Sequence, residues 1–245
     1  MKVLATYNIK GGVGKTSTAV NLAYLAAREG RRTLLWDLDP QGAATYMFRV
    51  RPRVKGGSLA LVTRKWPIEA ALKATDFDNL DLLPADFSYR NMDLELDDTK
   101  KRTTRLGKLL ASVDGDYDVV FLDCPPSVSL VSENVLHASD TLLVPLIPAT
   151  LSLRTLDQLT RFVADSEGSR PEIVAFFSMA DRRKRLHRDV IDTIPRDGTR
   201  IADTVIPALS IIEQMAERRA PVADFAPDSR AARCYEQLWA EVRPR

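Results

Sequence analysis

A glycine-rich loop near the start of the chain limits the possible folds more than any other feature. Residues 10–16 read Lys-Gly-Gly-Val-Gly-Lys-Thr and follow a short apolar run at 3–7. Between a strand and a helix, such a loop lets backbone N–H groups surround a phosphate at the positive end of the helix. The ordinary phosphate-loop pattern requires a glycine five places before Gly14, where this sequence has Ile9. A glycine pair and an additional lysine, Lys10, stand there instead.

Strands and helices alternate along the rest of the 245 residues. Apolar runs predict strands at 3–7, 33–36, 80–83, 119–122, 141–147, 173–178 and 204–206. Apolar residues at helical spacing predict helices after residue 16 and over 151–163, 184–194 and 228–242. This alternation predicts an α/β fold, a mostly parallel twisted sheet with helices on both faces. Because we find no internal repeat and no linker, we expect a single domain over residues 1–245.

The composition excludes several classes of protein. A formal net charge of +2 gives no bulk attraction to nucleic acid, so such binding would need a local patch. The two cysteines, Cys124 and Cys234, lie far apart and indicate neither a disulfide framework nor a metal knuckle. No apolar stretch reaches the roughly eighteen residues that cross a bilayer, and the N-terminal apolar run is too short for a secretory signal. We therefore expect a cytoplasmic protein that does not bind membranes.

Polar residues follow the apolar strands at the expected carboxyl edge of the sheet, where ligands bind in open parallel sheets. Lys15 can reach the β- and γ-phosphates of a nucleotide, and the Thr16 hydroxyl can bind Mg²⁺, which prefers oxygen ligands. We expect Asp123 to hold a magnesium-bound water and Asp39 to orient the attacking water. The magnesium site is thus assigned to Thr16, Asp39 and Asp123. These few groups suffice for slow hydrolysis of a triphosphate.

Several segments together resemble the ParA/MinD family of deviant Walker A ATPases, and its ParA branch more closely. Residues 10–16 match the family's K-G-G-x-G-K-[TS] loop, 37–41 its D-x-D-P-Q switch, and 123–126 its D-x-P-P segment. The C-terminal part also resembles the ParA ending, through Val205-Ile206-Pro207, Pro221-Val222 and Tyr235. The resemblance covers the whole chain. It implies a P-loop NTPase fold, ATP and Mg²⁺ as cofactors, and ATP hydrolysis that is slow without a partner.

The resemblance also implies roles for individual residues. Lys10 would be the signature lysine that reaches across a homodimer to the partner's ATP, with Lys15 and Asp39 as the other catalytic residues. Such a second cation would neutralise charge that develops during transfer, as an arginine finger does. Pro207 would lie against the adenine, with Met179 as a further candidate. The expected nucleotide-binding residues are Lys10, Gly11, Gly12, Val13, Gly14, Lys15, Thr16, Ser17, Met179 and Pro207.

The densest basic run opens the helix expected at 184–194. It contains Arg182, Arg183, Lys184, Arg185 and Arg188. Such a run is either a solvated helix face or a patch for sequence-independent, salt-sensitive binding to DNA phosphates. ParA-like proteins bind DNA nonspecifically through basic residues in this region, and Arg183 lines up with one of their arginines. Another arginine of the family is replaced here by Ile211, and Arg218 and Arg219 are the candidates to compensate.

These observations predict an ATP-switched, ParA-like ATPase. ATP would close a homodimer that binds DNA nonspecifically and associates with the nucleoid. The dimer would position or segregate a plasmid, a chromosome locus or a protein assembly through a ParB-like or analogous adaptor that stimulates hydrolysis. Because we expect the first strand at residue 3 and the last helix at 228–242, we expect neither an N-terminal helix-turn-helix nor a MinD-type membrane anchor. Two alternatives remain open: a nucleotide-gated scaffold of the same fold that does not use DNA, and a small-molecule ligase on a related fold.

Overall fold

The computed structural model describes residues 1–166, 170–194 and 199–244. Within these residues, eight strands form one sheet in the order β3-β4-β2-β5-β1-β6-β7-β8. The strands are β1 Lys2–Thr6, β2 Thr33–Asp37, β3 Lys73–Ala74, β4 Leu80–Leu83, β5 Val119–Asp123, β6 Thr141–Leu146, β7 Glu172–Ala180 and β8 Arg200–Pro207. The described strand pairs are parallel except that of β3 with β4. The predicted α/β fold with a mostly parallel sheet is confirmed.

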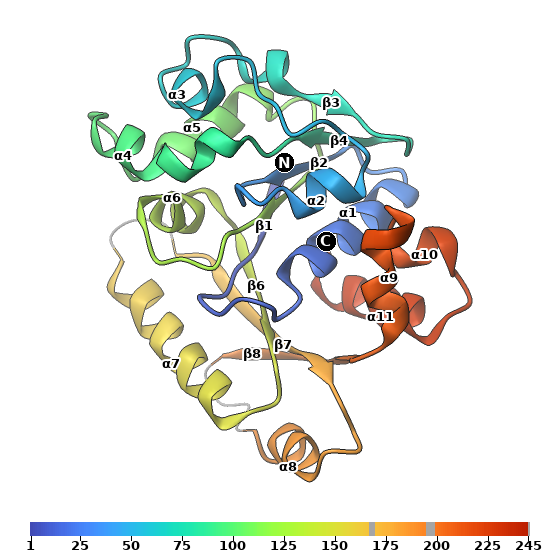
Figure 1. Cartoon of the computed structure of the whole chain (residues 1–245). Helices are drawn as coiled ribbons and strands as arrows, with labels where there is room; N and C mark the ends of the chain where they lie inside the picture. Colours follow the sequence, from blue (N-terminus) through green and yellow to red (C-terminus); the bar gives the residue numbers. More distant parts are fainter. Residues whose placement is uncertain (167–169, 195–198, 245) are drawn as a thin grey trace.

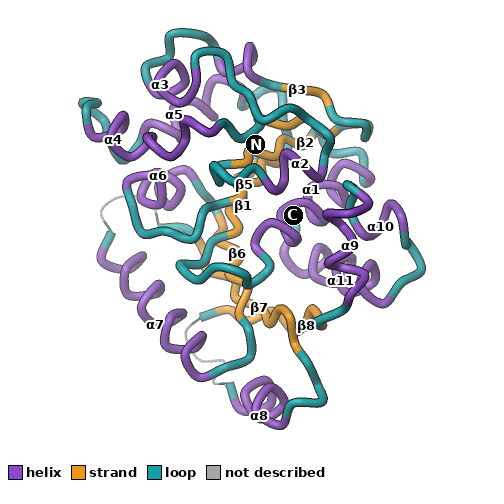
Figure 2. Tube along the Cα trace, viewed as in Figure 1, coloured by secondary structure: helices purple, strands orange, loops and turns teal. Residues whose placement is uncertain are grey.

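Helices cover both faces of this sheet (Figures 1 and 2). One face carries α1 Lys15–Arg28, α2 Ala43–Met47, α9 Ser210–Arg218, α10 Val222–Phe225 and α11 Arg230–Val242. The other carries α3 Gly57–Val62, α4 Met92–Asp97, α5 Arg105–Leu110, α6 Leu130–Ala138, α7 Thr150–Asp165 and α8 Arg185–Thr193. Three short 3-10 turns complete the described elements: η1 Ile68–Ala71, η2 Phe87–Asn91 and η3 Ala111–Val113.

The central strand β5 shows why its sequence is apolar without interruption. Successive side chains of a strand point to opposite faces of the sheet. Val120 and Leu122 therefore belong to the core beneath α5, α6 and α7, whereas Val119 and Phe121 belong to the core beneath α1 and α11. All four side chains are completely buried. A strand covered on both faces needs apolar residues at every position, as this one has.

The strand register brings the polar residues of the expected site to one edge. Strand β1 lies between β5 and β6, with Thr6 opposite Asp123, and Asp37 at the end of β2 is also opposite Asp123. The chain leaves β1 for α1 on one face, and leaves β5 for α6 on the other. In parallel α/β sheets, ligands bind at the carboxyl edge where the connections diverge in this way.

Some elements differ from the sequence prediction. Strand β8 is longer than 204–206 because it pairs with β7 from Arg200 to Pro207. The carboxylate of Glu241 in α11 accepts hydrogen bonds from the backbone N–H groups of Asp203 and Thr204. Helix α9 was not predicted. No helix in the described part of the chain is long and apolar enough to cross a membrane. The assignment of a single domain stays a prediction.

Candidate functional site

The loop between β1 and α1 has the backbone of an anion cradle. Gly12 and Gly14 have φ values of 68° and 93°, in the left-handed region that favours glycine. A Cβ atom on Gly14 would also lie 2.7 Å from the Ser178 Oγ, so a side chain there would collide with β7. Gly14 is the N-cap residue of α1, and no side chain accepts a capping hydrogen bond from the first N–H groups of this helix. The first N–H groups of the helix therefore remain available to an anion.

Two buried side chains hold this loop in place. The Asn8 Nδ2 donates to the Pro145 carbonyl at 2.8 Å, and the Asn8 Oδ1 accepts from the Lys10 N–H at 2.9 Å. The Lys15 Nζ donates to the Lys10 carbonyl at 3.0 Å. Burial lowers the pKa of Lys15, an effect that the nearby Asp123 carboxylate opposes. The Lys10 side chain itself is exposed and pairs with no carboxylate among the described residues.

Like that of Asp37, the carboxylate of Asp123 is completely buried at this edge. Burial raises its pKa well above the ordinary value, as do the neighbouring Asp37 and Asp39 carboxylates, whereas Thr16 and Lys15 lower it. Its Oδ2 atom has no hydrogen-bond partner among the described residues. A buried polar atom without a partner is costly, and therefore indicates a ligand. Carboxylate and hydroxyl oxygens suit Mg²⁺, so the residues present fit this ion.

Asp37 has a role that the sequence did not reveal. Its Oδ2 accepts hydrogen bonds from the Thr45 N–H at 2.8 Å and from the Thr45 hydroxyl at 2.7 Å. The same hydroxyl accepts from the Ala85 N–H at 2.8 Å. The Asp37 Oδ1 accepts from the Asp39 N–H at 3.3 Å. Burial raises the pKa of Asp37 to about 6. Asp37 thus fixes segment 38–42, and with it Asp39, to the edge of the sheet.

A pocket of about 230 Å³ adjoins the glycine loop. Five of the residues that the sequence assigned to the nucleotide line it: Gly12, Gly14, Ser17, Met179 and Pro207. Ile212 and Tyr235 also line it and were not predicted. A pocket of mainly apolar walls beside a phosphate cradle suits a flat base.

Met179 has an unusual backbone conformation at the rim of this pocket. Its φ is 53°, a value uncommon outside glycine. The pairing of β7 with β8 shifts in register between Phe177 and Ala180, so β7 is irregular at this point. Met179 is 40% exposed, whereas Ser178 and Ala180 on either side are buried. The irregularity therefore turns one apolar side chain out of the sheet and over the pocket.

The basic run around α8 is partly neutralised within the chain. The Arg183 guanidinium donates twice to the Asp181 carboxylate at 3.0 Å, and holds the pKa of Asp181 at about 2. Arg185 pairs with Asp189, and the Arg188 guanidinium donates to the Arg182 carbonyl. The charged groups of Arg182 and Lys184 have no such partner among the described residues. These two are the immediately available cations of the run.

Arg218 and Arg219 lie apart from the basic run. They end α9, beside α2, whereas α8 lies at another end of the molecule (Figure 1). The Arg219 Nε donates to the Tyr46 carbonyl at 3.0 Å, and its guanidinium lies 4.6 Å from the centre of the Tyr46 ring. Ile211 packs against the core beneath α1 and α11. The DNA-binding roles of these residues stay predictions.

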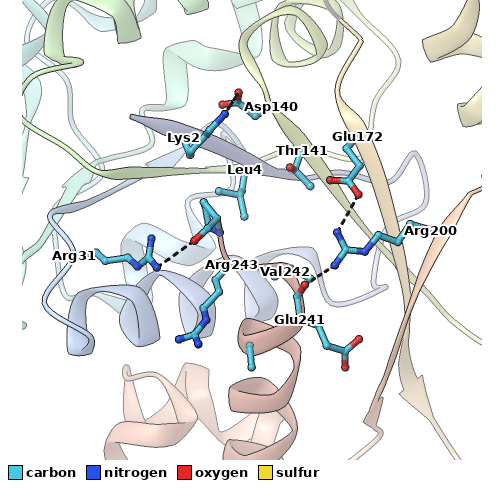
Figure 3. Close-up of a pocket in the computed structure, with 12 residues that line it drawn as sticks. Lys2, Leu4, Arg31, Asp140, Thr141, Glu172, Arg200, Glu241, Val242 and Arg243 are labelled. Atoms are coloured by element: carbon cyan, nitrogen blue, oxygen red, sulfur yellow. Dashed lines mark hydrogen bonds and ion pairs between the residues drawn. The ribbon is translucent and has the colours of Figure 1, made fainter.

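A larger hollow, of about 1020 Å³, lies at the opposite edge of the sheet, where several strands begin (Figure 3). Its cations are Lys2, Arg31, Arg200 and Arg243. Each of them forms an ion pair, with Asp140, Glu29, Glu172 and Glu29 respectively. This hollow therefore has little positive charge to offer a phosphate.

Comparisons with known proteins extend over the whole chain. The AAA domain family model matches residues 1–172. The sporulation initiation inhibitor protein Soj of Bacillus subtilis is 34% identical over 247 residues, which cover 98% of this chain and 98% of that protein. The chromosome partitioning protein ParA of Caulobacter vibrioides is 34% identical over 250 residues, 99% of this chain and 94% of that protein.

The solved structures include one of similar sequence and fold. It is cobyrinic acid a,c-diamide synthase from Mycobacterium smegmatis with bound ATP analog and magnesium. The TM-score is 0.84 at 30% identity, over 98% of this chain and 93% of that chain. The similarity thus spans the segment of the glycine loop and the C-terminal helices alike.

Proposed function

Because the chain belongs to the ParA/MinD family of ATPases, we propose that it is an ATP-switched positioning ATPase that acts as a homodimer on DNA. ATP and Mg²⁺ are its cofactors. One observation carries most of the argument: the buried Asp123 Oδ2 has no hydrogen-bond partner among the described residues, and it lies near Thr16 at the head of α1. This is where a phosphate-bound Mg²⁺ would bind.

In this proposal the chain's own groups mainly position and neutralise the triphosphate. The N–H groups at the head of α1 and the Lys15 ammonium bind the β- and γ-phosphates. Thr16 and Asp123 would hold Mg²⁺, which would neutralise charge on the phosphates. Asp39 orients the attacking water. One Asp39 oxygen already accepts the Gln41 N–H at 2.9 Å, and this fixes the direction of the carboxylate. Met179 and Pro207 lie against the base.

The exposed surface around the loop supports the homodimer. Ile9, Val128 and Leu151 are 36%, 57% and 68% exposed, and they follow β1, β5 and β6 at the carboxyl edge. Apolar side chains gathered beside a ligand site favour a protein partner there. The exposed Lys10 is free to reach the phosphates of the second subunit. ATP then lies between two copies, each of which completes the other's site.

DNA binding is proposed to follow dimerisation because two basic runs then act together. Arg182 and Lys184 supply available cations on each subunit, and Arg183 and Arg185 can exchange their aspartates for phosphates. Each added phosphate contact steepens the salt dependence of binding. An adaptor bound to the cargo, of the ParB kind or an analogous one, would stimulate hydrolysis and release the dimer from DNA. The cargo would be a plasmid, a chromosome locus or a protein assembly.

The test is DNA retention with ATP, with ADP and without nucleotide, each across a salt series. We expect strong retention with ATP that weakens steeply with salt, and weak retention in the other two states. Equal retention in all three states would overturn the proposed switch. In cells, the same switch would place the ATP form on the nucleoid.

A scaffold of the same fold that does not use DNA is a second candidate. The ion pairs of Arg183 and Arg185 and the apolar Ile211 favour it. It predicts that ATP drives dimerisation without DNA retention at any salt concentration.

A ligase is a third candidate, favoured by the structural similarity to a synthase. It predicts that ATP turnover requires an acceptor substrate. Steady ATP hydrolysis by the purified protein with DNA alone would exclude it.

A further inference from the structure

Helix α9 forms one wall of the pocket beside the glycine loop. Leu209, Ile212 and Glu213, at its beginning, line that pocket together with Gly12 and Gly14 of the loop. The position of α9 therefore decides the width of the space available to a base. Two side chains fix that position, one in α1 and one at the C-terminal cap of α9 itself, and the proposed function uses neither of them.

The first of these side chains is Asn21, a buried polar residue within the apolar face of α1. It is 1% exposed. Its Nδ2 donates to the Ser17 carbonyl at 2.7 Å and to the Met215 Sδ in α9 at 3.2 Å. Its Oδ1 accepts from the Val222 N–H at the start of α10, at 2.9 Å. One side chain thus joins the helix that follows the glycine loop to both α9 and α10.

The second side chain is Arg219, at the opposite end of α9. It caps the helix in a left-handed conformation, with a φ of 52°. Its guanidinium donates to the Tyr46 carbonyl and stacks on the Tyr46 ring. The Arg49 guanidinium donates to the neighbouring Arg218 carbonyl at 3.3 Å. Tyr46 belongs to α2, which directly follows segment 38–42 and is tied to Asp37 through Thr45.

We propose that Asn21 and Arg219 are positioning residues that clamp α9 between the phosphate-loop helix α1 and the switch helix α2, so that the base pocket changes with the phosphate state of the nucleotide. The inference rests on the proposed ATP site. In that site Asp39 orients the water that attacks the γ-phosphate, so segment 38–42 would contact a triphosphate and not a diphosphate. The two nucleotides therefore favour different positions of α2, and a ligand shifts an equilibrium only through such a difference. Because Arg219 contacts Tyr46, a change in the position of α2 also moves α9. Asn21 holds α9 next to the glycine loop, so the movement changes the shape of the base pocket.

Contacts with the base and contacts with the phosphates contribute separately to the affinity for ATP. Asn21 and Arg219 act on the base, whereas the glycine loop and Lys15 act on the phosphates. Magnesium tripolyphosphate has the phosphates without the base. A variant that displaces α9 should weaken ATP and leave tripolyphosphate unaffected.

The first experiment is calorimetry of Asn21→Ala with ATP and with magnesium tripolyphosphate. Because the variant leaves the buried Val222 N–H unpaired, we expect ATP affinity to fall about tenfold and tripolyphosphate affinity to stay unchanged. An equal loss for both ligands would overturn the inference, since it would show general damage to the loop.

The second experiment uses Arg219, a half-buried residue at the C-terminal cap of α9. For Arg219→Ala we expect the ratio of ADP to ATP-analogue dissociation constants to fall about threefold, a typical size for such coupling. Tyr46→Ala should give a similar change, and the double variant no more than either alone. Arg219→Lys should restore part of the ratio. Glu217→Ala, in the last turn of α9, is the matched control and should leave it unchanged.

Two results separate this inference from the proposed function. If the wild-type protein binds neither ATP nor tripolyphosphate, the proposed ATP site is wrong. If the wild-type protein binds both, but Arg219→Ala has the same ADP to ATP-analogue ratio as Glu217→Ala, the clamp is wrong and the ATP site stands.

Discussion

The two edges of the sheet differ in how their charges are satisfied. At the edge where several strands begin, Lys2 and Arg200 meet Asp140 and Glu172 within the chain (Figure 3). At the carboxyl edge, the Asp123 Oδ2 has no hydrogen-bond partner and Lys10 no carboxylate partner among the described residues. Both edges are polar, and the larger hollow lies at the first. The candidate site is therefore distinguished by polar groups that lack partners, and not by the size of its hollow.

This difference has a physical basis. A surface ion pair stabilises a fold by only about 0–1 kcal/mol, but it removes free charge from the surface. A buried carboxylate oxygen without a partner carries a desolvation penalty of about 1–3 kcal/mol or more. In the proposed site, Mg²⁺ would complete this group at the carboxyl edge. Substitutions at the two edges should consequently differ in their effects on function and on stability.

Lys15→Ala should give the largest effect. Without this ammonium group the β- and γ-phosphates lose a charge-assisted hydrogen bond in a buried site, so ATP affinity should fall roughly a hundredfold or more. Calorimetry measures the change. Lys2→Ala, a lysine at the other edge, is the matched control and should bind ATP normally. Unchanged affinity in Lys15→Ala would refute the phosphate-loop assignment.

Asp39→Ala should slow hydrolysis about a hundredfold, because the attacking water is no longer oriented. ATP binding should persist, so the variant should accumulate as an ATP-bound dimer on DNA. Phosphate release and light scattering measure the two effects, with Asp140→Ala as the control at the opposite edge. A monomer in the presence of ATP would count against the switch.

Replacement of Arg182, Arg183 and Arg185 by Glu should abolish DNA retention and spare ATP hydrolysis. The salt slope of binding should drop by about one for each phosphate that the variant can no longer bind. Arg183→Glu alone should act more weakly than Arg182→Glu, because the Arg183 guanidinium is already paired with Asp181. A gel shift across a salt series measures this order. Undiminished retention in the triple variant would place the DNA surface elsewhere.

Arg200→Ala, at the amino edge, should have the smallest effect. It breaks a pair with Glu172 whose partners are about half exposed, so the free energy of unfolding should fall by about 1 kcal/mol or less. Urea denaturation measures it, and ATP hydrolysis should stay the same. A loss of ATP binding in this variant would show that the two edges are coupled.

The sequence predicted the sheet well because apolar strands with no alternation require cover on both faces. The resemblance to the ParA/MinD family implied that Met179 and Pro207 lie beside the base, and both line one pocket with Gly12 and Gly14. The role of Asn21 was not predicted, because its Oδ1 atom meets the Val222 N–H at the start of α10 only in the folded chain. The pairing of Arg183 with Asp181 was equally hidden, because side-chain directions cannot be read from a run of like charges.

The fixed backbone of Lys10 limits what a second subunit must do. Asn8 and Lys15 already hold both the N–H and the carbonyl of this residue. Binding of the Lys10 ammonium to the phosphates of a second subunit would therefore immobilise only the rotatable bonds of the Lys10 side chain. The loss of side-chain entropy would cost about 2 kcal/mol at most. Such a contact can form and dissociate rapidly. The lifetime of the assembly would then follow the chemistry of the nucleotide rather than a slow refolding of the loop.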